Sequence, residues 1–107
     1  MGGVSKLSQS KVLAENKMPS QAELISLLER YQTGQYSDAE KLAQSFTERF
    51  PKHPFSWKML GAILGQTGRF SESLAYMQKS VQLSPQDAEA HNNLGNVFKA
   101  LDRLSEA

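Results

Sequence analysis

The sequence has no cysteine, no long apolar run and almost no net charge. The missing cysteine excludes disulfide scaffolds, zinc sites with Cys ligands and thiol nucleophiles. No apolar run approaches the roughly 18–20 residues that cross a bilayer, so we expect no membrane partner. The 12 basic and 11 acidic residues give a net charge of +1, which argues against a nucleic-acid surface. The 107 residues fit one small domain.

Residues 1–19 are mostly polar. Their scattered apolar residues never form the continuous core of a signal peptide. We therefore expect a disordered leader at residues 1–19 and a cytoplasmic location.

A period of about 34 residues runs through the remaining chain, 20–107. Matches at this offset are Gly34 with Gly68, Pro51 with Pro85, Trp57 with His91, and Leu60-Gly61 with Leu94-Gly95. The spacing of Trp57, Leu60 and Leu64 is that of one helix face. Gly68 then breaks this helix, and Pro85 ends the next one, so each unit is predicted to be a helical hairpin.

Local signals place the helix ends. Ser20-x-x-Glu23 and Ser37-x-x-Glu40 have the pattern of capping boxes, and Ser71 is predicted to cap the helix after Gly68. The small residue Gly61 lets the two helices of its hairpin approach closely. A single hairpin cannot bury its apolar face, so the units are expected to stack.

The motif Trp57-x2-Leu60-Gly61, followed by Gly68 and Pro85, strongly resembles the tetratricopeptide repeat (TPR) family. The resemblance implies an all-α fold in which hairpin repeats stack into a right-handed α-solenoid of about two and a half units. These units are a degenerate first repeat at 20–53, a full repeat at 54–87 and a truncated third repeat at 88–107. The apolar pattern of the first helix fits the repeat only if its turn is one residue shorter.

The chain offers few candidates for chemistry. His53 and His91 are far apart in sequence and have no nearby ligand cluster. His91 occupies the Trp position of its repeat, which favours a half-buried packing role. The carboxylates are scattered, and no phosphate loop or nucleophile motif occurs. We therefore expect no catalytic residue, no cofactor and no metal site.

By resemblance, the first helix of each hairpin lines a concave groove that holds a partner. The groove positions are Phe55, Lys58, Met59, Ala62 and Gln66 in one repeat, and Glu89, Asn92, Asn93, Asn96 and Lys99 in the next. The predicted binding set is Lys58, Met59, Gln66, Asn92, Asn93, Asn96 and Lys99. Asparagine offers a donor and an acceptor and so can pair with a peptide backbone. The alternative interpretation is a solvated polar face.

Two binding modes of the family can be compared with these positions. The carboxylate clamp of chaperone-binding members fits Lys58 and Asn93, but Ala62 stands where it needs asparagine. The asparagine ladder of the O-linked N-acetylglucosamine transferase superhelix matches Asn93, whereas Ile25 and Met59 occupy the equivalent earlier positions. At most one rung of a ladder is therefore present. The N-terminal part also resembles that of bacterial TPR proteins, some of which continue into glycosyltransferase or sulfotransferase domains.

Three classes of function follow from the resemblance. The first is a protein–protein interaction module that binds a peptide or protein segment in the groove. The second is the substrate-recruiting N-terminal part of a larger glycosyltransferase or sulfotransferase whose catalytic domain lies beyond residue 107. The third is a structural or oligomerising array. The last helix, with Leu94 and Phe98 on its open face, is expected to fray or to self-associate.

Overall fold

The computed structural model describes residues 18–106. They form five helices and no strand: α2 (Gln21–Gln32), α3 (Tyr36–Arg49), α4 (Pro54–Gln66), α5 (Phe70–Leu83) and α6 (Ala88–Glu106). The predicted leader lies outside the described residues, apart from the exposed Met18 and the fully buried Pro19. Within residues 18–106, no helix combines the length and apolar character that crossing a membrane requires.

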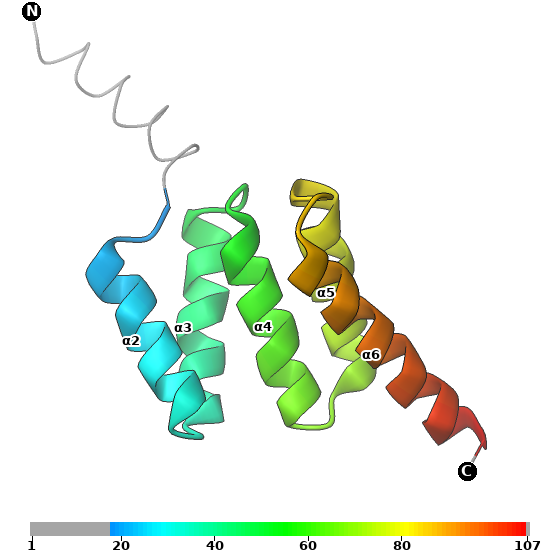
Figure 1. Ribbon diagram of the computed structural model, residues 1–107. Helices are drawn as coiled ribbons and strands as arrows, with labels where there is room; N and C mark the ends of the chain where they lie inside the picture. Colours follow the sequence, from blue (N-terminus) through cyan, green and yellow to red (C-terminus); the bar gives the residue numbers. More distant parts are fainter. Residues whose placement is uncertain (1–17, 107) are drawn as a thin grey trace, which may run out of the picture.

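Successive helices run up and down beside one another (Figure 1). The helices α2, α4 and α6 form the nearer layer in this view, and α3 and α5 form the farther one. Each helix packs on the next along the chain, and α4 also contacts α6 within its layer. The predicted all-α class and the stacking of helical hairpins are confirmed.

The turns inside the two complete hairpins have the same geometry. Gly34 and Gly68 both adopt φ = 79°, a left-handed conformation that strains any residue with a Cβ. The amide of Gln35 donates to the carbonyl of Arg30 at 2.8 Å, and that of Arg69 donates to the carbonyl of Leu64 at 2.9 Å. The prediction of a first turn shorter by one residue is therefore wrong, because both turns close in the same register.

The predicted helix caps meet different outcomes. The box at Ser20 is confirmed: its Oγ accepts from the amide of Glu23 at 3.2 Å, and the Glu23 carboxylate accepts from the amide of Ser20 at 3.0 Å. The caps at Ser37 and Ser71 are wrong, because α3 and α5 each begin one residue before the serine. The glycine turn leads the chain into the helix at once, and the serines then lie inside its first turn.

The two hairpins exchange a large and a small residue at equivalent positions of their paired helices. A Cβ on Gly61 would lie only 2.8 Å from Cγ of Met77, so the glycine makes room for that side chain. The equivalent positions one repeat earlier hold Leu27 and Ala43, both fully buried. The large residue is on the second helix in one hairpin and on the first helix in the other, so each hairpin fills the same space.

Phe46 on α3 lies in the main core and is fully buried. Its ring meets that of Phe50 edge to face, with centroids 6.4 Å apart. The guanidinium of Arg49 lies 5.7 Å from the centroid of Phe46 and 4.9 Å from that of Phe50. The core cluster around it comprises Leu27, Ala39, Ala43, Phe50, Met59, Leu60, Ile63 and Leu64.

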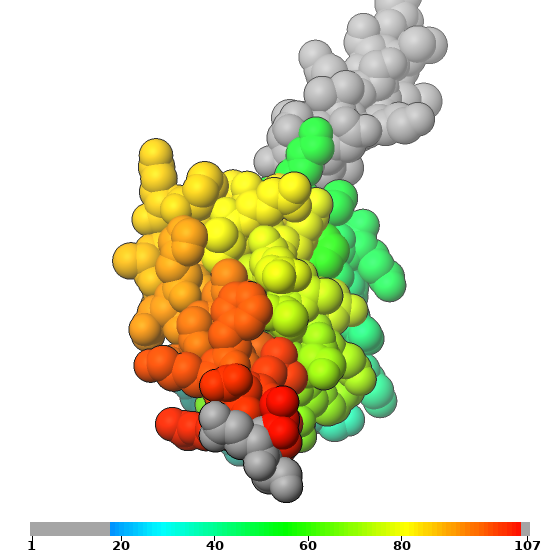
Figure 2. All heavy atoms as spheres, turned by 90° about the vertical axis from the view of Figure 1, so that its right-hand side faces the viewer, coloured from blue at the N-terminus to red at the C-terminus, as the bar shows by residue number. Residues whose placement is uncertain are grey.

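One face of α6 is open. Phe98 is 49% exposed and Leu104 is 60% exposed. Figure 2 looks onto this end of the array and shows α6, in orange to red, running across the surface with no other described helix in front of it. Self-association through this helix stays a prediction.

His91 stands at the position equivalent to Trp57 of the preceding repeat, and it makes the same contact with a backbone carbonyl. The indole N–H of Trp57 donates to the carbonyl of Pro51 at 2.8 Å, and Nε2 of His91 lies 2.7 Å from the carbonyl of Pro85. The predicted half-buried packing is wrong, because His91 is exposed. Trp57 stacks on Tyr76 of α5, with centroids 5.8 Å apart, and no described helix offers His91 such a partner.

Candidate functional site

A cavity of about 360 Å³ opens between α4 and α6, with α2 at one end. Its walls are formed by Tyr31, Lys58, Met59, Gly61, Ala62, Gly65, Gln66, Phe70, Met77, Glu89, Asn93, Asn96 and Val97. Most of these residues belong to the first helices of the hairpins, since those helices share one layer. We call this cavity the groove.

The structure brings most of the predicted binding set together. The predicted residues that line the groove are Lys58, Met59, Gln66, Asn93 and Asn96. Two further groove positions, Ala62 and Glu89, also line it, whereas Phe55 does not. Asn92 and Lys99 are exposed and are not among the lining residues. Participation of these two in binding stays a prediction.

The periodicity of α6 separates its asparagines. Residues three and four apart share a helix face, so Asn93, Asn96 and Val97 point to one side. Val97 is 6% exposed and lines the groove, which places this side of α6 toward the groove. Asn92 is one position before Asn93 and four before Asn96, so it lies at the edge of this face, and it is not among the residues that line the groove. The groove therefore has the amide side chains of Asn93 and Asn96 on α6, in addition to that of Gln66 on α4, beside an apolar floor that includes Met59.

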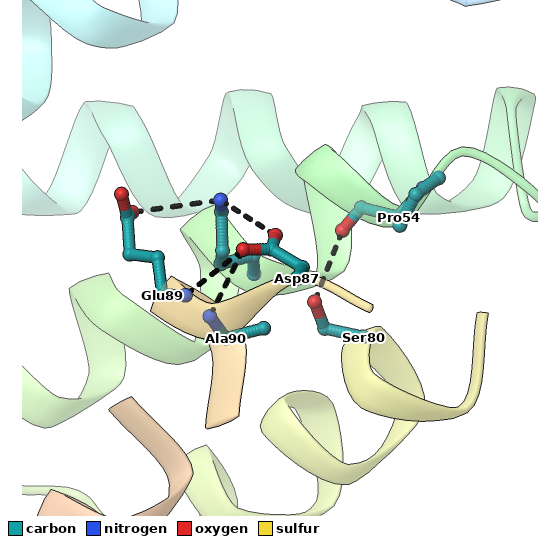
Figure 3. A network of polar contacts seen from close by, with 6 residues as sticks. Pro54, Ser80, Asp87, Glu89 and Ala90 are labelled. Carbon is teal, nitrogen blue, oxygen red and sulfur yellow. Dashed lines mark hydrogen bonds and ion pairs between the residues drawn. The ribbon is translucent and has the colours of Figure 1, made fainter. Parts of the chain in front are cut away.

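An ion-pair network joins α4 to the start of α6 (Figure 3). Nζ of Lys58 lies 3.0 Å from Oδ2 of Asp87 and 3.5 Å from Oε1 of Glu89. The other carboxylate oxygen of Asp87 accepts from the amides of Glu89 at 3.0 Å and Ala90 at 3.2 Å. Asp87 thus caps α6 and also anchors it to the preceding repeat.

The hydrogen bond from Lys58, together with those from the backbone amides of Ala90 and Glu89, holds the pKa of Asp87 below its usual value. The carboxylate therefore stabilises the folded state above its unfolded pKa, and this contribution is lost as the pH falls through the folded pKa.

Replacing Asp87 with asparagine should destabilise the protein at pH 7, because the charge is lost while an asparagine can still cap the helix. The loss of stability between pH 6 and pH 3 should also be smaller in D87N than in the wild type. Urea unfolding followed by circular dichroism across this range measures both effects. The control D102N changes an exposed carboxylate of the same helix. Equal pH profiles for wild type and D87N would contradict the role of Asp87.

Sequence reasoning missed two features of the site. Tyr31 of α2 lies at the end of the groove, where Nε2 of Gln66 is 3.5 Å from its hydroxyl. The partnership of Asp87 with Lys58 was also missed. An aspartate just before a helix indicates a cap, but no local sequence pattern connects Asp87, at the start of α6, with Lys58 on α4.

The groove offers hydrogen bonds, an apolar floor and a few charges. Within residues 18–106, no group of three or more His, Asp or Glu side chains could hold a metal ion. The amides of Asn93 and Asn96 can each donate and accept, so they suit a ligand with backbone-like polar groups.

The chain matches known sequences over most of its length. A family model for the tetratricopeptide repeat matches residues 27–88 and again residues 59–107. A UDP-N-acetylglucosamine–peptide N-acetylglucosaminyltransferase of Caenorhabditis elegans is 32% identical over 78 residues, which are 73% of this chain and 7% of that protein. The BBSome complex member BBS4 homolog of Drosophila melanogaster is 28% identical over 92 residues, 85% of this chain and 19% of that protein.

A third relative is the protein O-mannosyl-transferase Tmtc3 of Drosophila melanogaster. It is 40% identical over 48 residues, which are 45% of this chain and 5% of that protein. The chain thus spans at most 19% of the length of these three relatives.

Proposed function

Because the chain belongs to the tetratricopeptide repeat family, whose repeats are non-catalytic protein-interaction modules, we propose that it binds an extended segment of a partner protein in the groove. The observation that carries this proposal is the cavity of about 360 Å³, where Asn93 and Asn96 face Met59 and Gln66. The amides would pair with the backbone of the segment, and the apolar floor would receive its side chains.

Replacing both Asn93 and Asn96 with alanine should weaken peptide binding about tenfold or more. Each lost hydrogen bond contributes about 0.5–1.5 kcal/mol, and about 1.4 kcal/mol corresponds to tenfold in affinity. The probe is a set of peptides selected from a random library on the wild-type chain, and the readout is fluorescence anisotropy.

The matched control is N92A, which removes the neighbouring asparagine outside the groove and should leave affinity within about twofold. Circular dichroism would verify that all variants keep their helical content. Unchanged affinity in N93A/N96A would remove the groove as the binding site, and an equal loss in N92A would favour the set predicted from the sequence.

A second candidate is the substrate-recruiting part of a larger glycosyltransferase. Two of the three relatives are named as transferases of sugars, and the matched region is only 7% and 5% of their lengths. In that case the groove would hold a protein substrate for a catalytic domain in another part of a longer protein. The complete reading frame tests this candidate, since one without a glycosyltransferase domain would end it.

A further inference from the structure

The groove contains an unequal set of charges. Lys58 and Glu89 line it, and Asp87 lies beside them at the start of α6. The ammonium group of Lys58 pairs with both carboxylates, at 3.0 Å from Asp87 and 3.5 Å from Glu89, and dashed lines mark these two ion pairs in Figure 3. One positive charge thus faces two negative charges.

The three side chains differ in how open they are to a ligand. The side chain of Lys58 is 15% exposed, that of Asp87 is 26% exposed and that of Glu89 is 71% exposed. Asp87 is further engaged by two backbone amides. The charge that a ligand meets is therefore the carboxylate of Glu89.

This arrangement works against an acidic ligand. A peptide carboxylate that approached Lys58 would have to displace Asp87 or enter as a third negative charge beside two others. Both routes cost free energy, because like charges repel and the displaced carboxylate would lose its partner. A cationic side chain would share the exposed carboxylate of Glu89 with Lys58, and it would bring a second positive charge to balance the two negative ones.

We propose that the groove selects extended peptide segments that place a lysine or arginine side chain against Glu89, and that it disfavours acidic segments. This inference rests on the proposed peptide-binding function. Glu89, Asn93 and Asn96 follow one another along the groove side of α6, at intervals of about 6 Å and about 4.5 Å along the helix axis. An extended peptide rises about 3.3 Å per residue, so the basic residue lies about two residues from the backbone group bound by Asn93.

Selection from a random peptide library tests the charge preference. Peptides are selected on the immobilised wild-type chain, and those that still bind N93A/N96A are discarded. Among the remainder, lysine and arginine should be enriched at least about threefold over aspartate and glutamate, at one preferred position. The enrichment should diminish as the salt concentration rises.

Two substitutions at Glu89 then test whether this residue causes the preference for basic peptides. E89Q should abolish the enrichment, and E89K should invert it toward acidic peptides. The matched control E48K reverses a charge on an exposed residue of α3, outside the groove lining, and should keep the wild-type preference.

The outcomes separate the two proposals. If no peptide depends on Asn93 and Asn96, the groove function fails and the charge preference fails with it. If such peptides are found without a basic bias, or with an acidic one, the groove function stands and the preference is overturned. A basic bias that survives in E89K would also overturn the assignment to Glu89.

Discussion

Replacing Gly61 with leucine should lower the free energy of unfolding by about 3 kcal/mol, since an overfilled core forces side chains and backbone apart. A single Cβ at this position already comes within 2.8 Å of Cγ of Met77, and the sulfur and Cε of that residue are 3.0 Å away. Met77 is 2% exposed, so nearly all of its side chain is enclosed by the core atoms around it. Urea unfolding followed by circular dichroism measures the loss.

A second substitution, at Met77, should recover part of the free energy of unfolding that is lost in G61L. M77A alone should cost about 2–5 kcal/mol, because it leaves a cavity in the core. In the double variant G61L/M77A the leucine fills that cavity, as Leu27 does opposite Ala43 in the first hairpin. The combined loss should fall short of the sum of the single losses by about 2 kcal/mol. Strict additivity would show that the two positions do not share one space.

Replacing Phe46 with alanine should be comparably severe and should cost about 3–5 kcal/mol. The ring is fully buried, and it packs against Phe50 and beneath the guanidinium of Arg49. A domain of this size has a total stability of about 5–15 kcal/mol, so the variant should lose much of its stability. Thermal and urea unfolding followed by circular dichroism measure this change.

The matched control is F98A, which removes the same side chain from a position that is 49% exposed on α6. Its cost should stay below about 1 kcal/mol, because little apolar contact is lost. A similar loss in F98A and F46A would mean that α6 is covered in solution, and a small loss in F46A would show that the core tolerates the missing ring.

Much of the fold could be predicted because its signals are periodic or local. Gly34 matches Gly68 at the 34-residue offset, and both glycines adopt the same φ of 79°, whereas the apolar pattern of the first helix wrongly predicted a shorter turn. The capping box at Ser20 could be predicted because its signal, a serine three residues before a glutamate, is local in the sequence. The cap at Ser71 was misplaced, since the exact start of a helix depends on how the preceding turn closes.

The site was less accessible to sequence reasoning, because it depends on how neighbouring repeats cross. Resemblance to the family placed Asn93 and Asn96 in the groove, and they line it. The role of Asp87 depends on the packing of α6 against α4, which brings it within 3.0 Å of Lys58. Asn92, one position before Asn93 on α6, does not line the groove, so the rotation of the helix about its axis decides which amides a ligand meets.

The unlike partners inside the two hairpins should also disfavour the pairing of a helix with the wrong hairpin while the chain folds. Proteins built from similar units commonly fail by joining a segment to the wrong copy. If α4 took the place of α2 beside α3, Gly61 would stand opposite Ala43 and leave a hole. If α2 took the place of α4 beside α5, Leu27 would collide with Met77. Both wrong pairings should therefore be less stable than the native pairing of each first helix with its own second helix.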